Sequence, residues 1–88
     1  MSALNKEEME FIQQARTGLP PVIARASVAR YLGDMVAAQT LANADATGHG
    51  PERSWRVGQK IVYNTDSLLE WIVKKYGITR MRGINQSL

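Results

Sequence analysis

The feature that most constrains the fold is a pair of residues, Gly58-Gln59, between two runs rich in bulky and β-branched side chains. A Gly-X pair in that setting is typical of a two-residue hairpin turn. Pairing outward from the turn places Val57 opposite Lys60 and Arg56 opposite Ile61. The sequence therefore predicts a tight β-hairpin with basic side chains near its tip.

A short helix is expected before the hairpin, over about residues 36–46. Leu41 is the only large apolar side chain after its first residue, and several alanines share its face at helical spacing. Gln39 and Asn43 are four residues apart and point away from that face. Such amides either face water or hydrogen-bond to adenine edges in the major groove of DNA, and spacing alone leaves both interpretations open. A Gly- and Pro-rich break at residues 47–51 is predicted to end the helix.

The residues before this helix predict another one. Residues 25–32 place Val28 and Leu32 on one face, and Gly33 follows where many helices end in the left-handed conformation. Two helices joined by a short glycine-containing turn form a helix-turn-helix, in which the second helix reads DNA. The preceding segment is expected to be extended, with a short strand at Val22-Ile23 as one option.

Two longer helices are predicted to flank this unit. The first, residues 5–16, starts with the capping-box pair Asn5 and Glu8. The second starts near Thr65 or Asp66, either of which can cap it, and ends before the next glycine. Helical spacing predicts that their inward faces carry Met9, Ile12 and Ala15 in the first and Leu68, Trp71, Ile72 and Tyr76 in the second.

Composition narrows the class of protein. The 88 residues suit one domain with a modest core. Cysteine is absent, which excludes disulfides and thiolate metal sites, and no run of 18 apolar residues exists to span a membrane. The N-terminus lacks the pattern of a secretory signal, so a cytoplasmic location is expected. With one histidine, His49, and no phosphate-cradling loop, we expect no enzyme activity, no cofactor and no metal.

Charge is unevenly distributed along the chain. Residues 52–88 hold seven basic and three acidic residues, a net charge of +4, whereas residues 1–51 carry −1. This asymmetry favours a polyanionic partner, although basic residues at a hairpin tip can also simply protect strand edges. The secondary candidates for phosphate contacts, beyond those near the hairpin, are Arg25, Arg30, Lys74 and Lys75.

Taken in order, VARYLG, TLANADATGHGP and RVGQKIVYNTDSLLEWI resemble the excisionase/MerR-type winged helix-turn-helix group. That group shares a T-L-x-N helix, a G-x-GP break, an R-x-G-x-x-x-x-Y hairpin and an aspartate-leucine…tryptophan helix. The resemblance covers about residues 19–76 and rests on the order and spacing of these motifs together. The matching residues are Thr40, Leu41 and Asn43; Gly48, Gly50 and Pro51; Arg56, Gly58 and Tyr63; Asp66, Leu68 or Leu69, and Trp71.

The resemblance implies a mainly α fold with a small β-hairpin, about four helices and a two-stranded wing. Residues 1–18 would form an N-terminal helix, 19–77 the winged helix-turn-helix domain, and 78–88 a flexible basic tail. The helix at about 36–46 would enter the major groove of double-stranded DNA, and the wing at about 54–63 would touch the adjacent backbone. The residues expected to contact DNA are Gln39, Thr40, Asn43, Arg53, Arg56, Gln59 and Lys60.

The group's known role is DNA binding by small phage or prophage proteins, among them excision factors and transcriptional activators of integrase genes. The implied partners are duplex DNA, further copies of the chain bound cooperatively, and an integrase or recombinase. Two departures matter: Ala37 and Ala38 stand where a capping serine is usual, and Gln59 replaces a basic residue at the wing tip. Both remove phosphate contacts. The alternative is a protein-interaction module that contacts an integrase, packaging or other phage-type partner.

Overall fold

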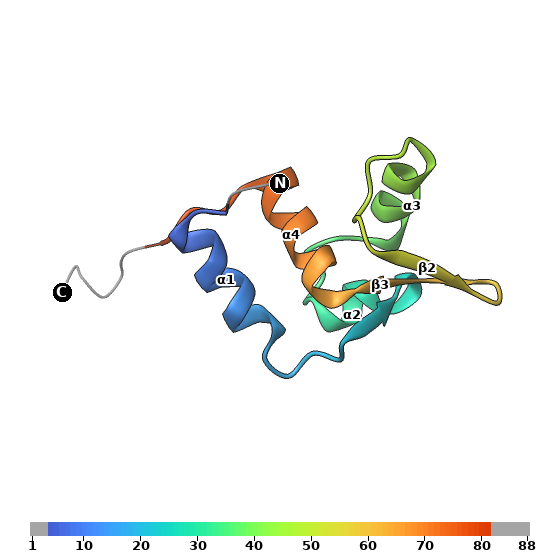
Figure 1. The fold of residues 1–88 in the computed structure, drawn as a ribbon, viewed down its shortest axis with the longest axis horizontal. Helices are drawn as coiled ribbons and strands as arrows, with labels where there is room; N and C mark the ends of the chain where they lie inside the picture. Colours follow the sequence, from blue (N-terminus) through green and yellow to red (C-terminus); the bar gives the residue numbers. More distant parts are fainter. Residues whose placement is uncertain (1–3, 82–88) are drawn as a thin grey trace.

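A computed structural model describes residues 4–81 of the chain (Figure 1). Over these residues, four α-helices and a three-stranded antiparallel sheet form a mixed α/β fold. The elements in chain order are α1 (Lys6–Arg16), β1 (Val22–Ala24), the 3-10 turn η1 (Arg25–Ser27), α2 (Val28–Tyr31), α3 (Ala38–Ala46), β2 (Ser54–Val57), β3 (Lys60–Asn64) and α4 (Thr65–Tyr76).

The hairpin of β2 and β3 has the predicted turn and register. Val57 pairs with Lys60 and Arg56 pairs with Ile61, which confirms the pairing expected from a two-residue connection. Gly58, the first residue of that connection, has a φ of 67°, a conformation that glycine adopts without steric cost.

The sheet has a third strand, at the place of the optional strand at Val22-Ile23, so the fold is mixed α/β and the sheet is larger than the expected two-stranded hairpin. The four helices and the hairpin itself agree with the expectation. β1 pairs antiparallel with β3, with Ile23 opposite Tyr63, and β3 becomes the central strand. Both of these side chains are buried, because pairing β1 with β3 turns Ile23 toward the helices. The extra strand therefore covers an edge of β3 that a two-stranded wing would leave open.

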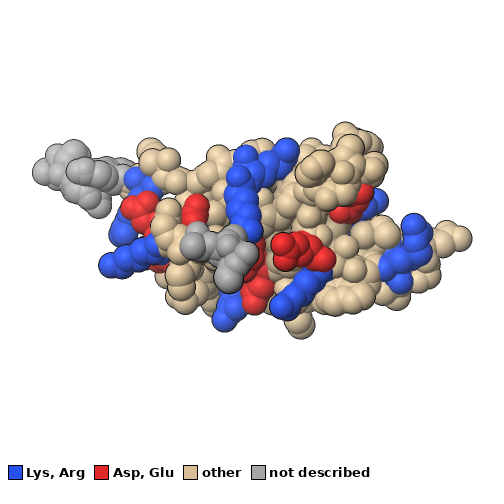
Figure 2. Space-filling view, turned by 45° about the horizontal axis from the view of Figure 1, so that its top comes forward, with Lys and Arg blue, Asp and Glu red and all other residues tan. Residues whose placement is uncertain are grey.

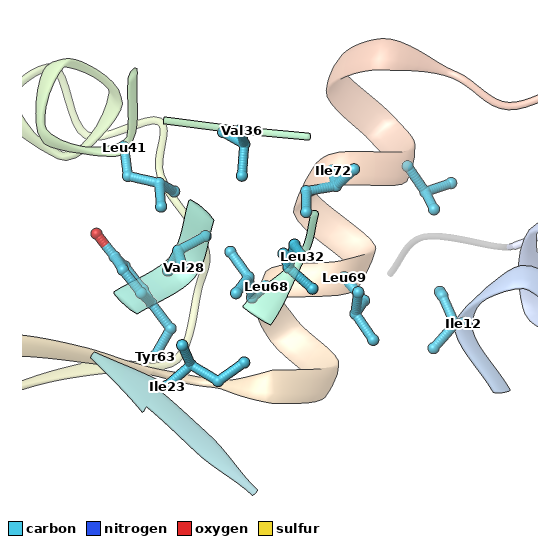
Figure 3. Close-up of a cluster of buried hydrophobic side chains, with 11 residues drawn as sticks. Ile12, Ile23, Val28, Leu32, Val36, Leu41, Tyr63, Leu68, Leu69 and Ile72 are labelled. Carbon is cyan, nitrogen blue, oxygen red and sulfur yellow. The ribbon is translucent and has the colours of Figure 1, made fainter. Parts of the chain in front are cut away.

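The core lies between the inner face of the sheet and the helices (Figure 3). Tyr63 points from β3 toward α3, with its ring beside Val28 and Ile23 and its hydroxyl on the side of Leu41. The fully buried side chains with the largest volumes are Tyr63, Ile23, Leu41, Leu68, Leu69, Val28 and Val73. Residues from α2, α3, α4 and two strands thus share one core, and α3 is anchored to it through a single leucine.

α1 packs against α4, and its capping box is present as predicted. The Asn5 side chain accepts a hydrogen bond from the Glu8 amide at 2.7 Å, and the Glu8 carboxylate accepts one from the Asn5 amide at 3.0 Å. Ile12 is buried, but Met9 is exposed, so the predicted inward stripe was wrong at that position. Ala15 packs on the core as predicted, and Phe11 packs there where Met9 was expected.

The helices around the central turn begin or end at other residues than predicted. Residues 25–32 divide into η1 and α2, and Gly33 and Asp34 both have positive φ, which turns the chain sharply. α3 starts at Ala38 rather than at residue 36, because Val36 is buried in the core as a loop residue.

α4 is capped by Asn64, not by Thr65 or Asp66 as predicted. The Asn64 side chain accepts a hydrogen bond from the Ser67 amide, whereas the Thr65 hydroxyl donates to the carbonyl of Pro20. The helix ends at Gly77 as expected. Tyr76, predicted to face the core, is exposed, because the last turn of α4 extends past the sheet.

The segment after α4 returns to α1. Ile78 packs on the core, and Arg80 lies 3.4 Å from the Glu10 carboxylate. The rest of the expected basic tail, including Arg82, lies outside the described residues. No helix within residues 4–81 is both long enough and apolar enough to cross a membrane.

Candidate nucleic-acid interface

The outward side of α3 is a ridge formed by two amide side chains. Gln39 and Asn43 are both exposed, while Leu41, two residues from each, is fully buried on the opposite side. The Gln39 Nε2 donates a hydrogen bond to the Asn43 Oδ1 at 3.0 Å. This hydrogen bond leaves the Asn43 Nδ2 donors and the Gln39 Oε1 acceptor available to a ligand.

One flank of α3 faces the hairpin across two shallow hollows. The first is lined by Ala42 and Ala46 of α3 and by Arg56 of β2. The second lies near the start of α3, where Ala38 is opposite Lys60 and the turn residue Gln59. Small side chains on this flank let the hairpin lie along the helix.

The basic residues of the hairpin do not form one cluster. Arg56 pairs with Ile61, on the face that also carries Tyr63 and is directed toward α3. Lys60 pairs with Val57, so strand alternation starts its side chain on the other face of the hairpin, but Lys60 sits beside the turn and still lines the hollow opposite Ala38. Arg56 and Lys60 therefore line separate hollows. Arg53, also exposed, stands just before β2, and its amide is bonded to the Ser67 hydroxyl.

The other flank of α3 faces α4 across a hollow of about 720 Å³, which we call the α4-side hollow. The Trp71 indole N–H donates to the backbone oxygen of His49 at 2.7 Å, which ties the break after α3 to α4. Trp71 is thus a partly buried anchor, as the core interpretation of its spacing suggested. The hollow is lined by Thr40, Asn43, Ala44, Thr47, His49, Trp71, Lys74 and Lys75.

A half-buried polar cluster joins three elements beneath the hairpin flank. The Asp45 Oδ2 accepts hydrogen bonds from the Tyr63 hydroxyl and from the Arg25 Nη2, both at 2.6 Å, and the Arg25 Nε donates to the Tyr63 oxygen at 2.9 Å. Burial and the hydrogen bond to Asp45 raise the pKa of Tyr63 to about 12, and the bonds to Tyr63 and Asp45 raise the pKa of Arg25. The three groups hold α3 to the sheet with opposite charges balanced.

This cluster was not predicted, and it changes the expectation for Arg25. Arg25, a secondary candidate for phosphate contact, is committed to Asp45, and Asp45 presents no uncompensated charge to a ligand. The sequence separations of 20 and 38 residues exceed any helix or hairpin spacing, so local pattern carried no signal of it. The glycine of the break, Gly50, also belongs here, because a β-carbon at that position would lie 1.8 Å from the Asp45 Oδ1.

The described cations divide into paired and unpaired groups. Arg16, Arg25 and Arg80 are each within 4 Å of a carboxylate. Figure 2 shows that Lys and Arg side chains occur as separate groups with acidic side chains among them, not as one continuous stripe. The cations without a carboxylate partner in residues 4–81 are Lys6, Arg30, Arg53, Arg56, Lys60, Lys74 and Lys75.

Four of these seven unpaired cations lie on the hairpin or on the last turn of α4, on either side of α3, and Arg53 stands just before β2. Arg30 is placed elsewhere, 5.3 Å from the ring of its neighbour Tyr31. The part of the chain that the structure describes contains no group of three or more His, Cys, Asp or Glu side chains able to hold a metal ion.

Comparisons with protein-family models, with curated proteins and with solved structures gave no significant match to this chain. The function is therefore inferred from the geometry of α3 and its two flanks, together with the sequence motifs.

Proposed function

We propose that the chain is a winged helix-turn-helix protein that binds double-stranded DNA with sequence preference. α2 and α3 would form the helix-turn-helix, and the β2-β3 hairpin would be the wing, with β1 as a third strand. The observation that carries the proposal is the exposed amide ridge of α3 between two groups of unpaired cations. The resemblance to excisionase-type proteins supports a role as a small excision or transcriptional regulatory factor.

The dimensions of α3 suit this role. Its diameter with side chains, about 10–12 Å as in any α-helix, fits the major groove, which is about 12 Å wide. Gln39 and Asn43 would read base edges, because amides present a donor and an acceptor side by side as adenine does. Thr40, Arg53, Arg56, Gln59 and Lys60 would contact the sugar-phosphate backbone and set the register of the helix.

Fluorescence anisotropy with a labelled duplex across a salt series tests the proposal. Neutralising about three to six phosphates predicts a log–log slope of affinity against salt of roughly −3 to −5. Absence of binding near about 50 mM salt, or a flat response to salt, contradicts DNA binding.

Two substitutions test the division of roles on α3 and the hairpin. Asn43→Ala should flatten the preference among duplex sequences, because it removes a group that would contact bases. Lys60→Ala should weaken binding to all duplexes alike and lower the salt slope by about one, because a phosphate contact carries no sequence information. Identical behaviour of the two variants would show that the roles are assigned wrongly.

A protein-interaction module is the second candidate, and one observation favours it. The outer face of the sheet carries exposed apolar side chains from two strands, with Trp55 at 48%, Val57 at 61% and Val22 at 45% exposure. Exposed apolar patches of this kind mark many interaction surfaces. A partner that stays bound after nuclease treatment and in high salt supports this candidate, and loss of the partner under nuclease contradicts it.

A further inference from the structure

We infer that the α4-side hollow is a second phosphate-binding site, which holds the backbone of the DNA strand opposite to the one that the hairpin contacts. The inference rests on the proposed function and extends it, since it adds the last turn of α4 to the DNA-contacting surface. Its ligand is the phosphodiester group. The hollow is lined by cations of α4 and by hydrogen-bond donors of α3.

The charge in this hollow comes from Lys74 and Lys75. No carboxylate of residues 4–81 lies within 4 Å of either ammonium group. The Lys75 Nζ lies 5.6 Å from the ring centres of both Trp71 and Tyr76, whose rings are perpendicular to each other. A cation–π contact positions an ammonium group without neutralising it, so the charge of Lys75 remains available to an anion.

Hydrogen-bond donors from α3 form the opposite wall. Thr40 lines the hollow, and its hydroxyl has no hydrogen-bond partner among the described residues. The Asn43 Oδ1 already accepts from Gln39, which leaves its Nδ2 free to donate. Thr47 differs, because its hydroxyl donates to the carbonyls of its own helix. Thr40 thus faces two ammonium groups, a donor set that suits phosphate oxygens, while Asn43 keeps its proposed role as a base contact at the edge of the hollow.

The position of the hollow relative to the hairpin indicates which DNA strand it would contact. The hairpin lies along one flank of α3 and α4 along the other, so the two groups of cations are separated by the helix itself. A helix inserted in the major groove has one sugar-phosphate backbone on each side. Contact between Lys74 or Lys75 and the strand opposite the hairpin follows from this arrangement. The nearest acid on α4, Glu70, does not line the hollow.

The test compares salt slopes for duplex binding by the full chain. The variant with Lys74→Ala and Lys75→Ala should lower the magnitude of the slope by about two, since each lost phosphate contact removes about one. Lys6→Ala on α1 is the matched control and should leave the slope unchanged. The double substitution Lys74→Arg and Lys75→Arg keeps both charges and should restore most of the slope.

A second measurement reports the hollow directly. In a Trp55→Phe background the remaining indole is Trp71, so its emission should change when duplex is added and should not change in the alanine double variant. If the wild-type chain binds duplex with the expected slope but the alanine double variant matches it, the inference fails and the proposed function stands. If the wild-type chain binds no duplex, both fail.

Discussion

α1 and α3 are both short helices, but they are stabilised in opposite ways. α1 has a complete capping box, acidic residues in its first turn and Arg16 in its last, so its own sequence satisfies its ends. α3 starts at an alanine N-cap with no side-chain hydrogen bond, and has neither acidic residues in its first turn nor basic residues in its last. The comparison shows that α3 depends on contacts with the rest of the fold.

Those contacts are few and specific. Leu41 enters the core, Asp45 is held by Arg25 and Tyr63, and the backbone at Gly50 packs directly on Asp45. The exposed amide side chains of Gln39 and Asn43 take no part in these contacts. Because Gln39 and Asn43 make no contact that holds α3 to the fold, they are free to bind a ligand, which agrees with their proposed role.

The largest loss of stability is expected from Gly50→Ala, which would displace the Asp45 side chain that holds α3 to the sheet. The added carbon would meet the Asp45 carboxylate at 1.8 Å, and that group cannot move without leaving Arg25 and Tyr63. We expect a loss of about 2 to 3 kcal/mol in the free energy of unfolding, measured by urea denaturation.

Gly48→Ala is the matched control for that change. Its φ of 78° strains any other residue, but a β-carbon there meets no atom within 4 Å, so the cost should be about 1 kcal/mol. Equal losses for the two variants would show that the contact with Asp45 does not support α3.

The next largest effect is a loss of stability at alkaline pH, caused by ionisation of Tyr63 in the cluster with Arg25 and Asp45. The pKa of Tyr63 is about 12 in the folded chain against 10.0 for an ordinary tyrosine, mainly because of burial and then because of the bond to Asp45. Its contribution to stability is complete below pH 10 and is lost as the pH rises toward about 12. Thermal denaturation at pH 9 and 11.5 should show a fall of several degrees that is smaller in Tyr63→Phe.

Tyr76→Phe serves as the comparison, because that tyrosine is exposed at the end of α4. It should show the same alkaline loss as the wild-type chain. A Tyr63→Phe variant with an undiminished fall would mean that other groups cause the pH dependence.

The smallest effect should come from giving α3 the cap that α1 has. Ala37 has an extended backbone, with φ −93° and ψ 155°, which suits a serine N-cap. Ala37→Ser should therefore stabilise the chain by about 0.5 to 1 kcal/mol, and Asn5→Ala in α1 should destabilise it by a similar amount. The urea denaturation midpoints of the two variants measure how much a side-chain cap stabilises each helix N-terminus. A destabilising Ala37→Ser would show that the N-terminus of α3 cannot accept a side-chain cap.

Local patterns were sufficient wherever neighbours in sequence are also neighbours in space. The turn at Gly58, the hairpin register, the capping box at Asn5 and the helix end at Gly77 all follow from spacings of a few residues. Among site residues, the exposure of Gln39 and Asn43 also follows from helical spacing relative to Leu41.

Longer-range pairings decided the rest. The third strand joins residues about 40 apart, and the cap of α4 is Asn64 because Thr65 is committed to the segment before β1. Phe11 packs on the core where Met9 was expected, because the position of α4 decides which side of α1 is covered, and the sequence of α1 alone does not specify that position.

The sequence alone determined the helices, the hairpin and the outward amides, because backbone propensity and side-chain period act over a few residues. Only the tertiary structure decided which charges are neutralised. In the fold, Arg25 pairs with Asp45, while Lys74 and Lys75 lie beside α3 without a carboxylate partner. Ion pairs form between side chains that are close in space, and the tertiary structure sets these distances between residues far apart in the chain.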